Sequence, residues 1–318
     1  MAELQGPVLI TGGLGYVGGR VASYLRQRHE TLPINLMTRQ RRPSATWTSA
    51  FNVIEGDILD EAAIGRAVEG AKAIVHLVAS NAAESARDPR MALDVTSKGT
   101  LMLLEAAEKA GTERFVYIST FHVYGGHEAT SINEDTLPQP THPYAITHYA
   151  AEQFVSMFRA RGTIETLIFR LSNCYGAPMD PGADCWSLVF GDLCRQAAEQ
   201  GRLVLSSSGK PQRDFISIRD VGRAVDHSLS LPSGSWGDGL FNLGGECSMS
   251  ILELSGHIAR VYEAKHGRPL PISTGNGDNP HTWEPVRFDV SKLKGIGFNP
   301  EHNLEEEVHR TLDLCSSL

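Results

Sequence analysis

The stretch LITGGLGYVGGR, residues 9–20, begins at the end of the apolar run 7–11 and continues into a helical pattern. It holds Gly12, Gly15 and Gly18 in the spacing TGxxGxxG. Glycines let a backbone come close to a pyrophosphate, and the first turn of a helix offers unpaired N–H groups and the positive end of a dipole. The order strand, loop, helix therefore predicts a dinucleotide-binding site. A structural glycine-rich turn is the alternative interpretation.

Short apolar runs alternate with helical stretches through the first half of the chain. The expected strands are residues 7–11, 33–38, 51–56, 73–79, 114–120 and 165–172, and the expected helices include residues 60–70 and 143–161. Continuous apolar strands separated by helices are typical of a parallel sheet that is covered on both faces. The fold class we predict is α/β, a Rossmann-type doubly wound parallel sheet.

After residue 175 the chain becomes rich in Gly, Pro, Ser and Asp and its segments become short. This change predicts a smaller, loop-rich C-terminal substrate lobe. We expect residues 1–175 to form the dinucleotide-binding domain, with residues 213–245 returning to it. Residues 176–212 and 246–318 are expected to form the substrate-binding lobe.

The composition narrows the possible partners. Of the 318 residues, 41% are hydrophobic and 21% are charged, and the formal net charge is −8. This acidic balance, with Lys and Arg scattered, predicts no nucleic-acid partner. No segment approaches the ~18 continuous apolar residues of a membrane span, and the N-terminal residues do not read as a signal peptide. Five cysteines without a CxxC pair indicate free thiols in a reducing compartment, so we expect a cytoplasmic protein without a membrane partner. The dispersed histidines predict no metal site.

The end of the second expected strand bears on the choice of cofactor. The stretch LMTRQRRP places Thr38 and then Arg39 there, and no carboxylate follows until Glu55. An acidic residue at this point usually binds the ribose 2′-hydroxyl of NAD, whereas an arginine accommodates the 2′-phosphate of NADP. The sequence therefore favours NADP over NAD, with a solvated basic turn as the alternative.

Several further segments occur in a fixed order along nearly the whole chain. They are GDI at 56–58, HLVA at 76–79, STFHVYG at 119–125, PYAITHYAAE at 143–152, RLSNCYG at 170–176 and RDFISIRDVGRAV at 213–225. Together with the glycine loop they resemble the extended branch of the short-chain dehydrogenase/reductase superfamily, the NAD(P)-dependent nucleotide-sugar epimerase/dehydratase family. The resemblance implies that Tyr16, Val17, Asp57, Ile58, Leu77 and Ala79 also line the cofactor.

The resemblance assigns chemistry to four positions. It implies that Tyr144 is the acid/base, that Thr120 hydrogen-bonds the reacting sugar oxygen, and that Asn173 and Arg213 hold the diphosphate of the substrate. For Arg213 the alternative is a surface ion pair with Asp214 or Asp220, and for Thr120 it is capping of the strand end. Asp94 stands in DVTSKGT where the family carries Asn.

Residue 148 departs from the family's pattern, because His148 replaces a lysine. Positions four apart share one face of a helix, so Tyr144 and His148 can reach the same ligand, which makes His148 a catalytic and cofactor-binding candidate. A lysine charge would lower the pKa of the tyrosine, ordinarily about 10, by roughly 2–3 units. Histidine, with a pKa of about 6.5, is largely neutral at slightly alkaline pH. We therefore expect an active site with a less acidic Tyr144 and an upward-shifted pH optimum.

The stretch STFHVYG bears on the reaction. Related 4,6-dehydratases carry Asp and Glu where this chain has Phe121 and His122, and Phe cannot exchange a proton, so elimination of water is disfavoured. We expect His122 to contact substrate or to pack, with acid/base work as the alternative. A nucleotide-sugar 4-epimerase or 4-ketoreductase is the first prediction. The alternatives are an NADP-dependent reductase of a non-sugar carbonyl and a catalytically degraded dinucleotide sensor. A homodimer is also implied by the resemblance.

Overall fold

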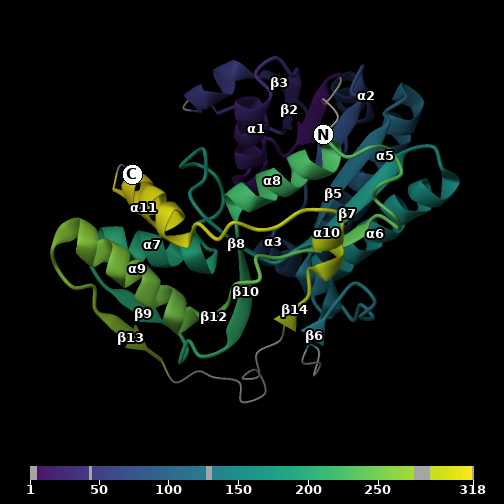
Figure 1. Cartoon of the computed structure of the whole chain (residues 1–318). Helices are drawn as coiled ribbons and strands as arrows, with labels where there is room; N and C mark the ends of the chain where they lie inside the picture. The colour runs from purple at the N-terminus through teal and green to yellow at the C-terminus, as the bar shows by residue number, and fades with distance from the viewer. Residues whose placement is uncertain (1–5, 43–44, 127–130, 276–286, 317–318) are drawn as a thin grey trace.

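The centre of the protein is a seven-stranded parallel sheet in the order β11-β7-β5-β4-β1-β2-β3. The computed structural model describes residues 6–42, 45–126, 131–275 and 287–316. The strands of this sheet are β1 (Val8–Thr11), β2 (Ile34–Thr38), β3 (Asn52–Glu55), β4 (Ala73–His76), β5 (Arg114–Thr120), β7 (Glu165–Leu171) and β11 (Leu240–Leu243). The predicted doubly wound parallel sheet is confirmed (Figure 1).

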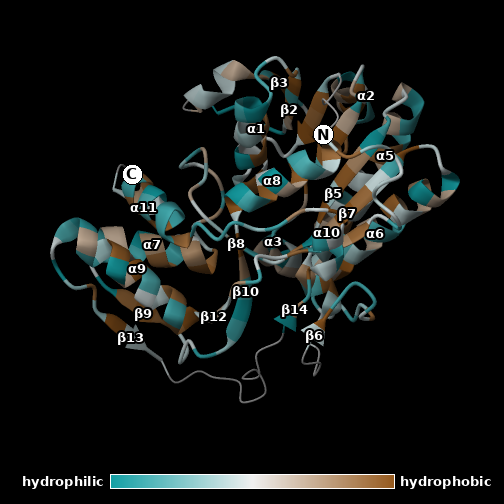
Figure 2. Cartoon of the chain, in the orientation of Figure 1, coloured by the Kyte–Doolittle hydropathy of each residue, from teal (hydrophilic) through white to brown (hydrophobic). Residues whose placement is uncertain are grey.

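Helices cover both faces of this sheet. The main ones are α1 (Tyr16–Arg28), α2 (Glu61–Val68), α5 (Gly99–Ala110), α6 (Pro143–Arg161) and α8 (Ile218–Leu229). Apolar side chains of α1 and α8 pack into the core on one face, and those of α2, α5 and α6 form the core on the other. Figure 2 shows the resulting hydrophobic strands enclosed by helices whose outer sides are hydrophilic. Most apolar residues of α6 thus belong to the core of this chain.

The strand order reverses at β1, which pairs with β2 on one side and with β4 on the other. In open α/β sheets, ligands bind beyond the carboxyl ends of the strands at such a point. The expected strand 73–79 is shorter than predicted, because β4 ends at His76. The next N–H, that of Leu77, donates to the side-chain oxygen of Thr11 (3.3 Å) instead of continuing the ladder. Leu77 and Ala79 therefore lie in the loop beyond the sheet edge.

A smaller unit lies beside this sheet (Figure 1). Its strands are β8 (Asn173–Tyr175), β9 (Leu203–Leu205), β10 (Gln212–Ser217), β12 (Ser248–Ser250) and β13 (Ile272–Thr274), and its helices are α7 (Val189–Gln200), α9 (Ile251–His266) and α11 (Leu304–Cys315). These elements share an apolar core of their own. Within the segment 213–245, α8 and β11 lie with the large sheet, whereas β10 pairs with β8 and β12.

Short elements complete the described fold. They are β6 (Ser131–Ile132), β14 (Arg287–Phe288), α3 (Ala82–Arg87), α4 (Pro89–Ala92), a π-helix (Leu93–Lys98), α10 (Ser291–Gly295), and 3-10 helices at Thr46–Ala50 and Phe121–Tyr124. The stretch GDNPHTWEP, in which we expect part of the substrate specificity to reside, lies outside the described residues.

A buried polar network fixes α6 to the sheet. The Glu152 carboxylate on α6 accepts hydrogen bonds from Arg170 Nη2 (2.7 Å) and Ser119 Oγ (2.6 Å), on β7 and β5. The Arg170 and Glu152 side chains are only 4% and 2% exposed. The Arg170 guanidinium also lies 4.7 Å from the ring centroid of Tyr124, whose hydroxyl donates to Asn242 Oδ1 (2.6 Å) on β11. The network thus joins one helix to three strands.

Arg170→Met will lower the free energy of unfolding by about 3–5 kcal/mol, because it leaves the Glu152 carboxylate buried without its counter-charge. The double variant Arg170→Met with Glu152→Gln removes both charges, so it will recover much of that loss. Urea denaturation of the wild type, both single variants and the double variant measures the cycle. A double variant as unstable as the sum of the two singles would contradict the assignment.

Candidate active site

The glycine loop between β1 and α1 leaves the start of the helix open. Gly12 has a φ of +69°, which favours glycine. A Cβ at Gly18 would lie 2.2 Å from the carbonyl oxygen of Gly12, so a side chain there would push α1 away from the loop. The N-cap residue Gly15 provides no side-chain hydrogen bond to the first turn of α1. The first N–H groups of this helix therefore suit a phosphate oxygen, which fits a dinucleotide cofactor.

Two residues that the resemblance placed at the cofactor point elsewhere with their side chains. The hydroxyl of Tyr16 donates to the carbonyl oxygen of Gly176 (2.9 Å), just beyond β8. The Val17 side chain packs against the apolar core. Because both residues belong to the first turn of α1, their backbone N–H groups are the parts that face the loop.

The arginines of the basic turn after β2 differ in the hydrogen bonds and ion pairs that they form. Arg42 donates to Asp180 Oδ2 and to the carbonyl oxygen of Leu14, each at 3.0 Å. The hydroxyl of Thr38 donates to the carbonyl oxygen of Gln40 (3.0 Å). Arg39 is exposed and forms no ion pair with the described residues. Of the arginines in the stretch LMTRQRRP, Arg39 is thus the one whose charge is most available to a ligand.

The remaining cofactor candidates lie after β3 and β4. Asp57 is exposed and its carboxylate accepts from the N–H of Leu59 (2.9 Å), which fixes the turn after β3. Ile58 is buried beside Gly99, where a Cβ would lie 3.0 Å from it. Leu77 and Ala79 follow β4 and are half-buried. All four residues lie just beyond the carboxyl ends of the strands that flank β1 and β2.

Tyr144 lies in the first turn of α6, next to both of its predicted partners. Its ring centroid is 4.6 Å from that of His148, and the two rings meet edge to face at 66°. Burial raises the pKa of Tyr144 above 10, while a hydrogen bond with the side chain of Thr120 opposes the rise. Thr120 Oγ1 also accepts from the N–H of His122 (3.2 Å), so it both caps the strand end and faces Tyr144. The phenol is therefore protonated at neutral pH.

His148 is held as a neutral imidazole. The residue is buried, with 3% of its surface exposed, and Nδ1 lies 2.8 Å from the hydroxyl oxygen of Tyr117. Nε2 is buried and has no hydrogen-bond partner among the described residues. Burial lowers the pKa of His148 to about 3, and the nearby His122 contributes to the shift. An unpartnered buried nitrogen beside Tyr144 suits a ligand oxygen.

The substrate candidate His122 also lies near Tyr144. The His122 ring centroid is 6.0 Å from that of Tyr144. Burial, followed by the charge of Arg213, lowers the pKa of His122 to about 4, so this imidazole is also neutral near pH 7. Burial lowers the pKa of Arg213 as well. The tyrosine is thus surrounded by neutral groups, with one cation farther out.

The alternative for Arg213, a surface ion pair, is not formed with either aspartate. The carboxylate of Asp214 accepts from the N–H groups of Gly245 and Cys247, and Asp220 pairs with Arg223. Asn173 Nδ2 donates to the carbonyl oxygen of Asp214 (3.0 Å) and so joins β8 to β10. The amide oxygen of Asn173 is the part left for a ligand.

Asp94, which stands where the family carries Asn, lies on a π-helix. This residue is exposed on the π-helix Leu93–Lys98. Two positions later, Thr96 is buried, and its Oγ1 accepts from the N–H of Ser80 (3.1 Å) in the loop after β4. A π-helix widens the turn by one residue, which changes the faces that residues present. Sequence reasoning missed Thr96, because it matched Asp94 to the family's asparagine, whereas three positions before Gly99 the chain has Thr96.

Sequence reasoning also missed His76 and Tyr117, which lie behind the site. His76 on β4 is fully buried, and its two ring nitrogens lie 2.6 Å from Thr11 Oγ1 and 2.9 Å from Thr100 Oγ1. Its ring centroid lies 5.6 Å from that of Tyr117, and the rings are nearly parallel, at 29°. The available signal was a histidine within an otherwise apolar strand.

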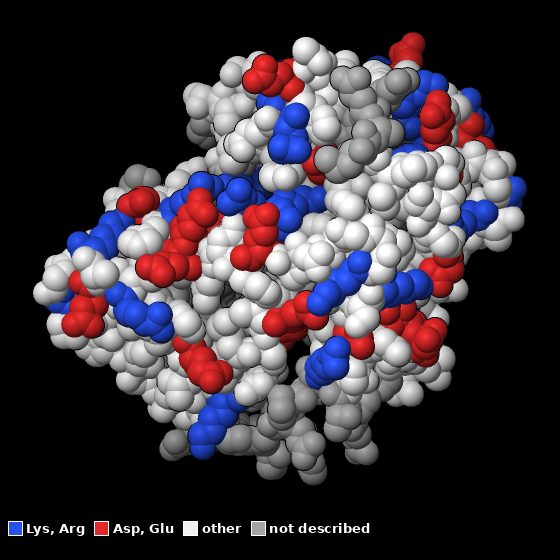
Figure 3. Space-filling model, viewed as in Figure 1, with Lys and Arg blue, Asp and Glu red and all other residues white. Residues whose placement is uncertain are grey.

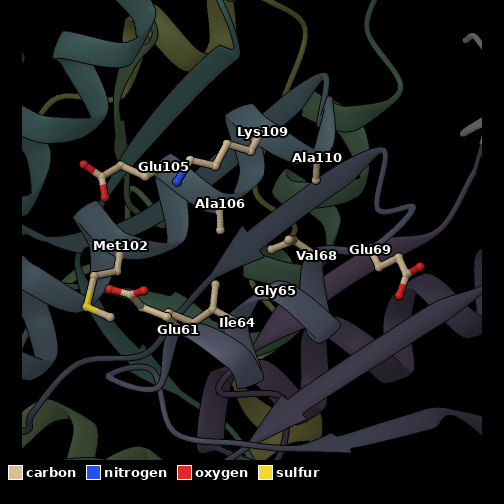
Figure 4. Close-up of a pocket in the computed structure, with 10 residues that line it drawn as sticks. All are labelled: Glu61, Ile64, Gly65, Val68, Glu69, Met102, Glu105, Ala106, Lys109 and Ala110. Carbon is tan, nitrogen blue, oxygen red and sulfur yellow. The ribbon is translucent and has the colours of Figure 1, made fainter.

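Other surface features do not belong to this site. An open hollow of about 420 Å³ lies between α2 and α5, and Glu61, Glu105 and Lys109 are among its polar residues (Figure 4). None of the predicted site residues lines it. On the face in Figure 3, acidic and basic side chains are interspersed. Within the described ranges, no helix is long and apolar enough to cross a membrane, and no group of His, Cys, Asp and Glu could hold a metal ion.

The open helix start, the switch point and the tyrosine in the first turn of α6 define a Rossmann-type, nicotinamide-dependent class of protein. The sequence pattern of the NAD dependent epimerase/dehydratase family matches residues 8–244. The chain belongs to this family of extended short-chain dehydrogenase/reductase enzymes, as the segments from 9–20 onward predicted.

Relatives cover the chain almost end to end. A dTDP-D-glucose 4,6-dehydratase from Mus musculus is 26% identical over 96% of this chain and 87% of its own length. A UDP-glucose 4-epimerase from Rhizobium leguminosarum bv. trifolii is 28% identical and covers 96% of both chains. The solved structure of MoeE5 in complex with UDP-glucuronic acid and NAD is 26% identical, covers 98% of this chain and 100% of its own, and has a TM-score of 0.79. Another solved structure of this fold holds NADPH, so the predicted cofactor type is confirmed at the level of NAD or NADP.

Acid will destabilise the fold through the neutral imidazoles. The pKa of His148 falls from its ordinary 6.5 to about 3 on folding, and that of His76 falls likewise. Between these pH values the unfolded chain binds protons that the folded chain excludes, so stability is full above pH ~6.5 and is lost as the pH falls.

At pH ~5 each such imidazole will cost about 2 kcal/mol of the free energy of unfolding relative to neutral pH. His148→Gln removes one of them, so the loss between neutral and acidic pH will be smaller in this variant. Urea denaturation at the two pH values measures the difference. An equal loss in the variant and the wild type would show that His148 is not held neutral.

Proposed function

We propose that the chain is a nucleotide-sugar 4-epimerase or 4-ketoreductase in which Tyr144 moves a proton at the sugar oxygen. The observation that carries this proposal is the position of Tyr144. Its hydroxyl is hydrogen-bonded with the side chain of Thr120. Its ring centroid lies 6.0 Å from that of His122 and 4.6 Å from that of His148, whose Nε2 is unpartnered among the described residues. A sugar oxygen and a cofactor ribose could thus both be reached from one helical turn.

Each of these residues has a distinct part in the proposed reaction. A nicotinamide cofactor, when bound, accepts or supplies the hydride at the sugar carbon. The Tyr144 phenol takes the proton of the sugar hydroxyl when the sugar is oxidised and returns it when the ketone is reduced. Thr120 holds the same oxygen by its hydroxyl group and so orients the oxygen–hydrogen bond. His148 donates a hydrogen bond to the cofactor in place of the lysine.

The absence of a lysine charge sets the acidity of the phenol. Burial already raises the pKa of Tyr144, and the neutral imidazole of His148 does not lower it as an ammonium would. The deprotonated form that acts as a base is therefore scarce at neutral pH. We propose that the rate of sugar oxidation rises with pH for this reason.

Dehydration is the less favoured reaction, although several relatives are 4,6-dehydratases. Elimination of water needs a proton donor and a base on the substrate side, and these positions are occupied by Phe121 and His122. The two rings lie 4.1 Å apart, centroid to centroid. His122 is neutral and can accept a proton, but the phenyl group beside it can neither donate nor accept one.

The substrate class follows from the cation near the site. A nucleotide sugar carries a diphosphate, and Arg213 has no carboxylate partner among the described residues. MoeE5 binds UDP-glucuronic acid, and we propose a related nucleotide sugar here. An NADP-dependent reductase of a non-sugar carbonyl would not need this cation. Arg213 therefore favours the sugar reading, and the intact Tyr144 favours an enzyme over a sensor.

We also propose that the protein is a cytoplasmic homodimer. Ile146 on α6, Met91 on α4 and Leu93 on the π-helix are exposed by 46%, 50% and 52%, which suits a helical interface between two copies. The five cysteines are free thiols in the structure, as a cytoplasmic protein would have them. Size-exclusion chromatography with light scattering would distinguish a homodimer from a monomer.

Tyr144→Phe will abolish turnover of UDP-sugars while it leaves NAD binding within about twofold, because only the proton-transfer group is lost. Absorbance at 340 nm reports the cofactor, and tryptophan fluorescence reports binding. Tyr262→Phe, the same change in the smaller lobe, is the matched control. Turnover that survives Tyr144→Phe would support the sensor or a different acid/base.

His148→Lys will shift the ascending limb of the rate profile to lower pH by roughly 2–3 units, because an ammonium stabilises the phenolate. The measurement is kcat of sugar oxidation as a function of pH for the wild type and the variant. His148→Gln, which adds no charge, will not produce the shift. Identical profiles for the wild type and His148→Lys would remove residue 148 from the proton chemistry.

Arg39→Ala will weaken NADP binding by about tenfold and leave NAD binding nearly unchanged, because the exposed guanidinium contacts only the additional phosphate. Isothermal titration with each cofactor measures both affinities. Arg66→Ala on α2 is a control for the loss of an unrelated positive charge. Equal effects on the two cofactors would contradict the preference for NADP.

A further inference from the structure

Tyr117 is buried directly behind His148. It lies on β5, is fully buried, and its ring centroid is 5.6 Å from that of His76 and 5.9 Å from that of His148. Its hydroxyl oxygen lies 2.8 Å from His148 Nδ1. The proposed reaction does not involve this phenol directly.

The protons of this contact can be assigned by counting donors and acceptors. Burial raises the pKa of Tyr117 well above 10, and the charge of Glu152 raises it further, so the phenol keeps its proton. Among the described residues, His148 Nδ1 is the single hydrogen-bond partner of that hydroxyl. The Tyr117 O–H must therefore donate to Nδ1. A neutral imidazole carries one proton, which then resides on Nε2.

The other tautomer of His148 is disfavoured by the same count. If Nδ1 carried the proton, the hydroxyl proton of Tyr117 and the lone pair of Nε2 would both be buried without a partner. His76 cannot relieve Tyr117, because both of its ring nitrogens already lie within hydrogen-bond distance of Thr11 and Thr100. The Nε2–H tautomer leaves one unpartnered group instead of two.

We propose that Tyr117 is a positioning residue that holds His148 in the Nε2–H tautomer, so that the buried Nε2 presents a hydrogen-bond donor to a hydroxyl oxygen of the nicotinamide nucleotide. The identity of that ligand rests on the proposed function, whereas the tautomer is a property of the protein alone. A neutral imidazole can be a donor or an acceptor at this nitrogen, unlike an ammonium. The phenol behind it decides which of the two it is.

The tautomer is measured by NMR on protein labelled with ¹⁵N-histidine, without added cofactor and at neutral pH. The His148 signals are assigned as those that disappear in His148→Gln. In the wild type we expect Nδ1 to have the shift of an unprotonated nitrogen and Nε2 that of a protonated one. In Tyr117→Phe we expect a mixture of tautomers. In Tyr262→Phe, whose hydroxyl accepts from Arg268 at 2.6 Å in the other lobe, we expect the wild-type pattern.

Binding of NAD provides the second readout. Tyr117→Phe will weaken it by roughly three- to tenfold, the effect of one hydrogen bond that is no longer held in place. A proton on Nδ1 in the wild type would overturn the proposal, whether or not the variant folds. An unchanged His148 pattern in folded Tyr117→Phe would also overturn it. If the wild type shows the Nε2–H pattern but binds no NAD or NADP, the assigned tautomer stands and the proposed function fails.

Discussion

The site depends on one buried contact, between the hydroxyl of Tyr117 and Nδ1 of His148. Burial keeps both groups neutral, so His148 offers a directed hydrogen bond where its relatives' pattern has a fixed charge. A neutral hydrogen-bond donor and a charged donor differ in their effect on the pKa of a neighbouring phenol. An ammonium lowers the pKa of the phenol across several ångströms, whereas a neutral imidazole acts mainly on the atom to which it is bonded. In the proposed reaction, His148 therefore serves cofactor binding and Tyr144 serves proton transfer.

The scaffold makes such a contact possible because α6 is fixed rigidly against the sheet. Glu152, one turn beyond His148, is hydrogen-bonded to Arg170 and Ser119, and these bonds set the rotation of the helix about its axis. Rotation by one residue would carry Tyr144 away from Thr120. The cost of burying the ion pair is thus accompanied by a precise placement of the residues that we propose to face the cofactor.

Much of the fold and part of the site could be predicted from the sequence. The glycine spacing and the apolar strands predicted the parallel sheet, because these features are local and periodic. The spacing of Tyr144 and His148 placed both on one face of a helix, as the structure has them. Other features depend on tertiary contacts. Tyr117 lies 31 residues from His148, and Arg42 lies 138 residues from Asp180. The π-helix on which Asp94 is exposed and Thr96 is buried has no periodic signal that could reveal it.

We propose that Tyr144 and His148 face the two ends of one nicotinamide riboside. A crystal structure of the protein with NAD bound tests this arrangement. We expect a ribose hydroxyl oxygen about 3 Å from His148 Nε2 and the nicotinamide ring beside the hydroxyl of Tyr144. A bound cofactor whose ribose leaves Nε2 unpartnered, or whose nicotinamide ring lies beyond reach of the Tyr144 phenol, would contradict it.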